Sequence, residues 1–197
     1  MITKNAAAVW SLRYYLVNGF TEQRKMHSVI NWQQDWRKVS GVPVKSPVTG
    51  QLFPVTQHPE PLYQQDLLPA AVCVRLEHGL ILAPFACQLQ TTLAVDRRLH
   101  FLHQSGTKLC LELSPKLAKL NGRGLHWLAA KAQPLTAGTP VLQLDLAFLQ
   151  LELDLEELYC LLYLDSPVRM DALYCRQSRL AAGQDPLFIM QLKKPLS

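Results

Sequence analysis

Short apolar runs of strand length follow one another from Lys45 onward, and each is broken by glycine, proline or a polar turn. Thirteen prolines are spread through the chain, a pattern that favours an all-β fold over a helical bundle. One long stretch, residues 145–164, has a pattern that is ambiguous between helix and strand, and one interpretation is a short helix from Leu146 followed by a strand. The clearest strand-length runs are AAVCVRL (70–76), LILAPF (80–85), LHFLHQ (99–104), KLCLELS (108–114), TPVLQLDL (139–146) and LFIMQL (187–192).

The run at residues 109–114 alternates strictly before the chain reaches Pro115. Leucines at 109, 111 and 113 are predicted to face one side of a strand, and Cys110 and Glu112 the other. A single carboxylate in so apolar a strand needs a partner, because burying an unpaired charge is costly. Glu112 is therefore a candidate functional residue.

A faint internal repeat links two of these regions. SPVTGQL at residues 46–52 returns as APFACQL at residues 83–89, with proline, glutamine and leucine at matching places. This spacing indicates a duplicated, hairpin-like unit.

Residues 1–44 differ from the rest, and we predict a basic, Trp-rich helical extension there, followed by a β domain over residues 45–197. Residues 1–45 hold seven basic and two acidic side chains, whereas residues 46–197 hold thirteen of each. Helices are expected over residues 6–17 and 21–39, and such a segment is typical of an interfacial membrane helix or of one packed on the domain. The candidate contact residues are Trp10, Arg13, Arg24, Lys25, Trp32, Trp36, Arg37 and Lys38.

Several classes of function find no support in the sequence. The five cysteines are well separated and sit mostly in apolar runs, so we expect buried thiols and no metal site. His100 and His103 would point to opposite faces of a strand, which makes them poor co-ligands for a metal. The charge-neutral domain argues against nucleic-acid binding. We predict no cofactor and a cytoplasmic location.

The order of SPVTG (46–50), LAPF (82–85), SGTKLCLELSPKLAKLNGRGL (105–125) and LTAGTPVLQLDL (135–146) resembles one family of bacterial proteins. That family is the glucose-type enzyme IIA domain of the phosphoenolpyruvate-dependent sugar phosphotransferase system. The resemblance covers about residues 45–195. It implies an antiparallel β-sandwich or flattened barrel built from a duplicated hybrid motif.

In such domains one histidine accepts a phosphoryl group from the histidine-containing phosphocarrier protein, and a second histidine on a neighbouring strand supports it. Alignment on KLNGRG (119–124) puts the acceptor position on Glu112 and the supporting position on Arg97. The resemblance also implies a partner-docking face around this pair, formed here by Val95, Leu113, Ser114 and Lys116. An ion pair between Glu112 and Arg97 across two strands is the expected arrangement.

With both histidines replaced, the resemblance implies a non-catalytic regulatory or protein-interaction module in sugar uptake or carbon regulation. Its partners would be phosphotransferase-system components, a permease or a regulated enzyme. Glu112 could imitate a phosphorylated histidine, or it could be an ordinary strand residue. The alternatives left open are an active phosphocarrier whose acceptor has moved to His100 or His103, and a scaffold attached to the membrane surface through residues 1–44.

Overall fold

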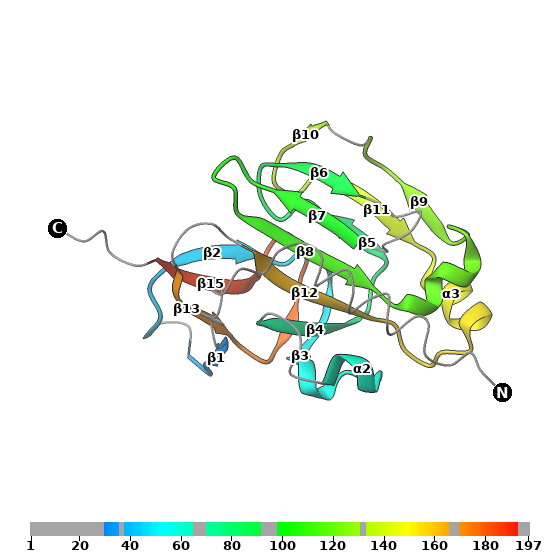
Figure 1. Ribbon diagram of the computed structural model, residues 1–197, viewed down its shortest axis with the longest axis horizontal. Helices are drawn as coiled ribbons and strands as arrows, with labels where there is room; N and C mark the ends of the chain where they lie inside the picture. The colour runs from blue at the N-terminus through cyan, green and yellow to red at the C-terminus, as the bar shows by residue number, and fades with distance from the viewer. Residues whose placement is uncertain are drawn as a thin grey trace, which may run out of the picture.

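The computed structural model describes residues 30–35, 38–64, 70–91, 98–130, 133–165 and 170–192. Within these residues the strands form three open sheets that are almost wholly antiparallel (Figure 1). The predicted all-β sandwich is confirmed, and the described strands close no barrel.

The largest sheet has eight strands in the order β10-β6-β7-β8-β12-β4-β3-β14. The strands at its centre are β7, β8, β12 and β4, so β8 lies between two long neighbours. The bounds are β3 (Gly50–Pro54), β4 (Ala71–Leu76), β6 (Cys87–Thr91), β7 (Arg98–Leu102), β8 (Lys108–Leu113), β10 (Pro134–Leu135), β12 (Tyr159–Asp165) and β14 (Arg179–Leu180).

Two smaller sheets complete the β framework. One has the order β1-β13-β15-β2 and the other the order β5-β11-β9. Their strands are β1 (Ile30–Trp32), β2 (Val42–Lys45), β13 (Met170–Cys175) and β15 (Pro186–Leu192), then β5 (Leu80–Leu82), β9 (Leu125–Trp127) and β11 (Pro140–Leu144). Among the residues described, four short helices lie between strands: η3 (Val55–Gln57), α2 (Pro61–Gln64), η4 (Pro115–Leu120) and α3 (Leu146–Leu153).

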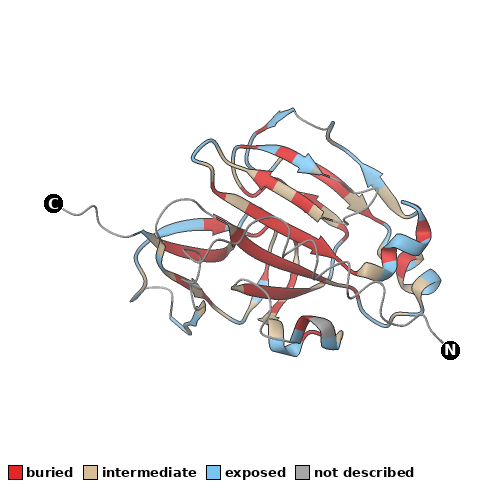
Figure 2. Ribbon diagram, viewed as in Figure 1, coloured by how far each residue is buried: buried red, intermediate tan, exposed pale blue. Residues whose placement is uncertain are grey.

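One continuous core joins the three sheets, and Figure 2 shows the buried residues following the central strands. Phe101 of the large sheet, Leu142 of the three-stranded sheet and Phe188 of the four-stranded sheet all belong to it, each with an exposed fraction of 0%. Apolar burial of this kind is the main source of folding free energy. The strands predicted from the apolar runs are confirmed, as is the change from helix α3 to strand β12.

The internal repeat corresponds to a repeated piece of structure. Strands β3 and β6 begin at matching positions of the two copies, Gly50 and Cys87. Each copy also receives one backbone hydrogen bond from a left-handed glycine in a later turn. Gly183 (φ 71°) donates to the carbonyl of Ser46, and Gly138 (φ 81°) donates to that of Ala83, both at 2.8 Å. The duplication therefore includes the turns that follow β14 and β10, where AAG (181–183) and TAG (136–138) match.

The predicted helix over residues 21–39 is wrong at residues 30–32, and residues 21–29, 36 and 37 lie outside the described residues. Ile30–Trp32 forms strand β1, which pairs in parallel with Leu173–Cys175 of β13. Ile30 packs against the core, so long-range pairing outweighs the local helical pattern. The predicted domain boundary at residues 44 and 45 falls inside β2.

Most of the predicted membrane or partner segment lies outside the described residues. Trp10, Arg13, Arg24, Lys25, Trp36 and Arg37 belong to that part. Of the other two candidates, Trp32 lies on β1 with an exposed fraction of 36%, and Lys38 is exposed. The described residues contain no helix long and apolar enough to span a membrane.

Candidate functional site

Strand β8 carries the candidate carboxylate at the centre of the large sheet. Leu109, Leu111 and Leu113 face the main core, which confirms the predicted alternation. The opposite face of β8 is also buried, since Cys110 has an exposed fraction of 1% and Glu112 one of 4%. We call the sheet face that carries Cys110 and Glu112 the outer face.

Arg98 and Tyr63 both donate hydrogen bonds to the buried carboxylate of Glu112. Arg98 lies directly opposite on β7, and its Nε donates to Oε2 at 2.7 Å. Tyr63, on α2, donates from its hydroxyl to Oε1 at 3.0 Å. The guanidinium is itself largely shielded, with an exposed fraction of 15%. A buried ion pair with both charges hydrogen-bonded avoids the penalty of an isolated buried charge.

Arg97 and Val95 lie outside the described residues, so the predicted pair of Glu112 with Arg97 stays a prediction. The basic partner that the structure shows is Arg98. Alternation along β7 could have indicated Arg98. Leu99 and Phe101 face the core, so the residues next to them in the strand must face the outer side of the sheet.

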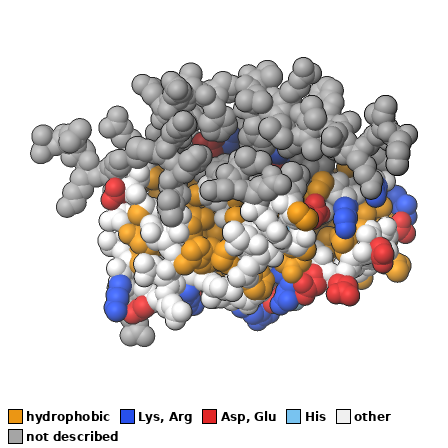
Figure 3. Space-filling view, turned by 60° about the horizontal axis from the view of Figure 1, so that its bottom comes forward, with side chains coloured by type: hydrophobic (Ala, Val, Ile, Leu, Met, Phe, Trp, Pro, Cys, Tyr) orange, Lys and Arg blue, Asp and Glu red, His pale blue; other side chains and the backbone are white. Residues whose placement is uncertain are grey.

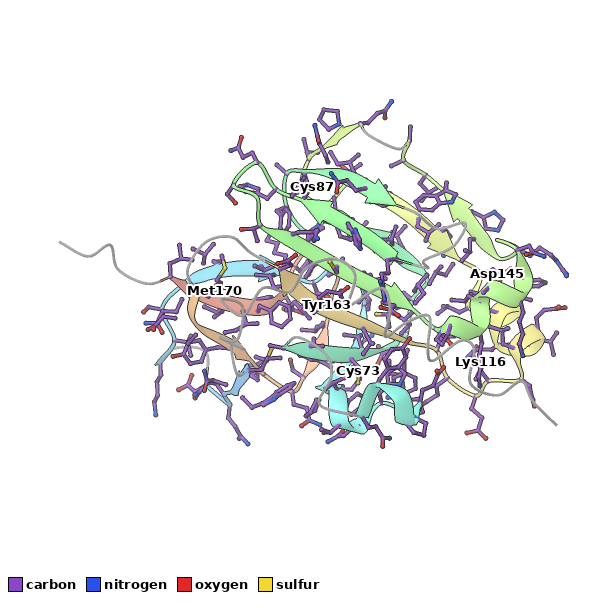
Figure 4. The ribbon with its side chains drawn as sticks, in the orientation of Figure 1. Cys73, Cys87, Lys116, Asp145, Tyr163 and Met170 are labelled. Carbon is purple, nitrogen blue, oxygen red and sulfur yellow. The ribbon has the colours of Figure 1, made fainter. Side chains whose placement is uncertain are left out.

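A short segment, Val55–Gln64, covers the outer face at this point, and we call it the cover. It contains η3 and α2, seen beside β3 and β4 in Figure 1. Tyr63 packs with Cys73 and Leu161, and Val55 contacts two small apolar clusters on the sheet. The cover has no signature in the sequence, because a four-residue helix leaves no periodic signal. Figure 4 labels Cys73 on β4 and Tyr163 on β12, two outer-face residues of neighbouring strands.

The cover also reaches the end of β8. Ser114 caps η4 by accepting the N–H of Lys116, and its hydroxyl donates to Oε1 of Glu60 at 3.1 Å. Leu113 and Ser114 have exposed fractions of 2% and 6%, whereas Lys116, which belongs to η4, is exposed (Figure 4). The cover therefore shields Glu112 and Ser114, which belong to the predicted site and its docking face.

The two histidines considered as alternative acceptors lie in different parts of the structure, one on strand β7 and the other in the turn that follows it. His100 is half-buried on the outer face of β7, opposite Cys110 and Gln90. His103 lies in the turn after β7, where its Nδ1 is 2.8 Å from Oγ of Ser105 and its ring packs edge-on against Phe85. Among the described residues, no group of three or more His, Cys, Asp or Glu side chains could hold a metal ion.

All five cysteines are free and buried, as predicted. Burial raises the pKa of the Cys73 thiol to about 12 and that of Cys110 to about 11. Because the thiolate is the reactive form, neither of these outer-face thiols is activated as a nucleophile at neutral pH.

An acidic cluster at residues 152–157 lies on the surface. Glu152, Asp154, Glu156 and Glu157 are exposed, and two of them form ion pairs, Glu152 with Arg123 and Glu157 with Arg75. Figure 3 shows charged side chains of both signs gathered on the right, the side on which α3 lies in Figure 1. An open hollow at the turn after β4 is lined by Thr49, His78 and Gln143 among others, and Glu112 is not one of its lining residues.

Comparison with known proteins identifies the architecture. The sequence model of a family described as the phosphoenolpyruvate-dependent sugar phosphotransferase system, EIIA 1, matches residues 42–160, more than half of the chain. The chain belongs to this family. The matched EIIA region runs from the start of β2 into β12, and it contains β7, β8, Glu112 and the cover.

A solved EIIA structure has the same fold. Glucose permease IIA from Mycoplasma capricolum matches with a TM-score of 0.63 and 14% sequence identity. The match covers 77% of this chain and 96% of the other. At this identity the similarity concerns the fold.

Proposed function

We propose that this EIIA-family protein does not carry phosphate and instead acts as a regulatory, protein-interaction module in sugar uptake or carbon regulation. The observation that carries the proposal is the state of Glu112. This residue stands where the family resemblance puts the phosphoacceptor, and it is buried and held by Arg98 and Tyr63.

The chemistry of phosphoryl transfer supports the proposal that Glu112 does not accept phosphate. A nucleophile must approach the phosphorus atom of its donor in line and must be accessible to the donor protein. Both carboxylate oxygens of Glu112 already accept hydrogen bonds, and the exposed fraction of the residue is 4%. The adjacent guanidinium neutralises its charge, which argues against a role as an imitation of phosphohistidine.

Family membership supports partners that are proteins, with phosphotransferase-system components as the first candidates. Among the described residues of the predicted docking face, Lys116 is the exposed one. By the family resemblance, glucose-type IIA domains have an aspartate at this position. A reversed charge would select a partner with a different surface charge. A cytoplasmic location follows as part of the proposal.

Phosphorylation in a reconstituted relay tests the proposal. The full chain is incubated with phosphoenolpyruvate, enzyme I and the phosphocarrier protein, and its mass is measured without acid treatment, which would hydrolyse a phosphohistidine. We expect no phosphoryl adduct, while an authentic glucose-type IIA domain is modified under the same conditions. An adduct on His100 or His103 would replace the proposal by the relocated-acceptor alternative.

Partner capture from the native cytoplasm tests the regulatory role. Wild-type protein and a Lys116→Glu variant are used as matched baits, since Lys116 is exposed and the variant should fold normally. We expect a protein that is retained by the wild type and lost with the variant. Sedimentation of the full chain with anionic vesicles addresses the membrane alternative, for which Trp10→Ala with Arg13→Gln is the matched variant.

A further inference from the structure

His58 lies at the junction of η3 and α2, inside the cover. Its exposed fraction is 2%, although histidine is a polar residue. The Nδ1 atom accepts the backbone N–H of Glu60 at 3.0 Å, and the carbonyl of His58 accepts from Nε2 of Gln64 at 2.7 Å. The first of these bonds requires an unprotonated Nδ1, because a protonated nitrogen cannot accept.

Aromatic rings surround the imidazole. Tyr63 meets it edge-on with ring centroids 4.7 Å apart, and Tyr159 of β12 lies at 5.6 Å. The nearby carboxylates have other donors: Glu60 accepts from Ser114, Glu112 from Tyr63 and Arg98, and Glu157 from Tyr159 and Arg75. A charge on His58 would therefore be poorly compensated, and burial lowers the pKa of this side chain to about 4.

We propose that the cover is a proton-sensitive latch, in which neutral His58 holds Val55–Gln64 on the outer face and protonation of its ring releases them. A proton from water binds Nδ1, the hydrogen bond from Glu60 is lost, and the imidazolium moves into solvent. Release would uncover Cys73, Leu161 and the carboxylate of Glu112. The inference goes beyond the proposed function and holds whether or not the chain is phosphorylated.

The direction and size of the effect follow from linkage. The pKa of His58 is about 4 in the closed state and would be about 6.5 when the ring is hydrated. The closed state is therefore fully favoured above about pH 6.5 and loses its advantage as the pH falls toward 4. At about pH 5 the closed-to-open ratio should be roughly 30-fold lower than at neutral pH.

The cysteines provide built-in reporters. Cys73 and Cys110 lie on the outer face in the clusters that Tyr63 and Val55 contact, whereas Cys160 and Cys175 lie in the main core. Opening of the cover should expose the first pair alone, while global unfolding exposes both pairs.

The experiment is thiol modification of the full chain with dithiodipyridine, which reacts in mildly acidic solution, read for each cysteine by mass spectrometry. Rates are divided by those of the denatured chain at the same pH. We expect the protection of Cys73 and Cys110 to fall roughly 30-fold between about pH 8 and pH 5 and to stay well below the protection of Cys160 and Cys175 at each pH. In His58→Asn the amide oxygen can still accept from Glu60 but cannot titrate, so the change should disappear.

The latch would be overturned if the protection of Cys73 and Cys110 were the same at about pH 5 as at about pH 8. An unchanged pH response in His58→Asn would also overturn it, as would protection of Cys73 and Cys110 equal to that of the core pair at each pH, which indicates that all four thiols react only through global unfolding. If His58→Asn does not fold, the comparison of the two cysteine pairs in the wild type still decides the matter.

Discussion

Tyr63 donates its hydroxyl proton to Oε1 of Glu112 at 3.0 Å, although 49 positions separate the two residues in the sequence. This bond joins the cover to the central strand of the large sheet. Together with Arg98 it makes the carboxylate a structural element of the fold.

Truncation of Glu112 should be strongly destabilising. Glu112→Ala leaves the guanidinium of Arg98 buried without its counter-charge, and we expect a loss of about 3–5 kcal/mol in the free energy of unfolding. The triple variant Glu112→Leu, Arg98→Met, Tyr63→Phe replaces these polar partners with apolar groups and should recover most of the loss. Urea denaturation measures both, and a triple variant no more stable than Glu112→Ala would contradict the interpretation.

Loss of the Tyr63 hydroxyl should lower the free energy of unfolding more than loss of a tyrosine hydroxyl that binds a neutral acceptor. Tyr63→Phe removes a bond to a charged acceptor, for which we expect about 1.5–3 kcal/mol. The control is Tyr174→Phe, which removes a half-buried bond to the neutral amide of Gln191 and should cost about 0.5–1.5 kcal/mol. Equal losses in equilibrium unfolding would mean that the Glu112 contact has no special role.

Alanine and asparagine should rank in opposite order at Gly50 and Gly138. Alanine should be the less destabilising substitution at Gly50, and asparagine the less destabilising one at Gly138. A methyl group on Gly50 would collide with the backbone carbonyl of Arg75, so Gly50→Ala should cost about 3 kcal/mol and Gly50→Asn more. Gly138 has open space but a φ of +81°. Gly138→Ala should therefore cost about 1–2 kcal/mol and Gly138→Asn less, since asparagine tolerates the left-handed region. Thermal unfolding of the four variants shows whether the order reverses.

Acid should weaken the protein partly through His58. Because the folded-state pKa is depressed to about 4, the stabilisation is present above about pH 6.5 and is lost as the pH falls toward 4. The full effect is about 3 kcal/mol. Carboxylates titrate in the same range, so the quantity to measure is the difference in unfolding free energy between wild type and His58→Asn at each pH. A difference independent of pH would show that His58 does not titrate in this way.

Parts of this structure could be read directly from the sequence. The leucines at 109, 111 and 113, the repeat at residues 46–52 and 83–89, and the change from helix to strand after Leu146 all appear as predicted. Each of these features depends on the spacing of apolar residues or on turn chemistry within a few positions of the chain.

Other parts depended on contacts between distant segments. Residues 30–32 favour a helix locally, but pairing with β13 makes them a strand. Arg98 meets Glu112 because the register of β7 and β8 puts them opposite one another, and Tyr63 arrives from a segment without periodicity. The sequence by itself determined which faces are apolar, because side-chain alternation is a property of the local backbone. Only the tertiary structure decided which charged and polar groups meet, since strand register and the path of the cover are set by packing across the whole fold.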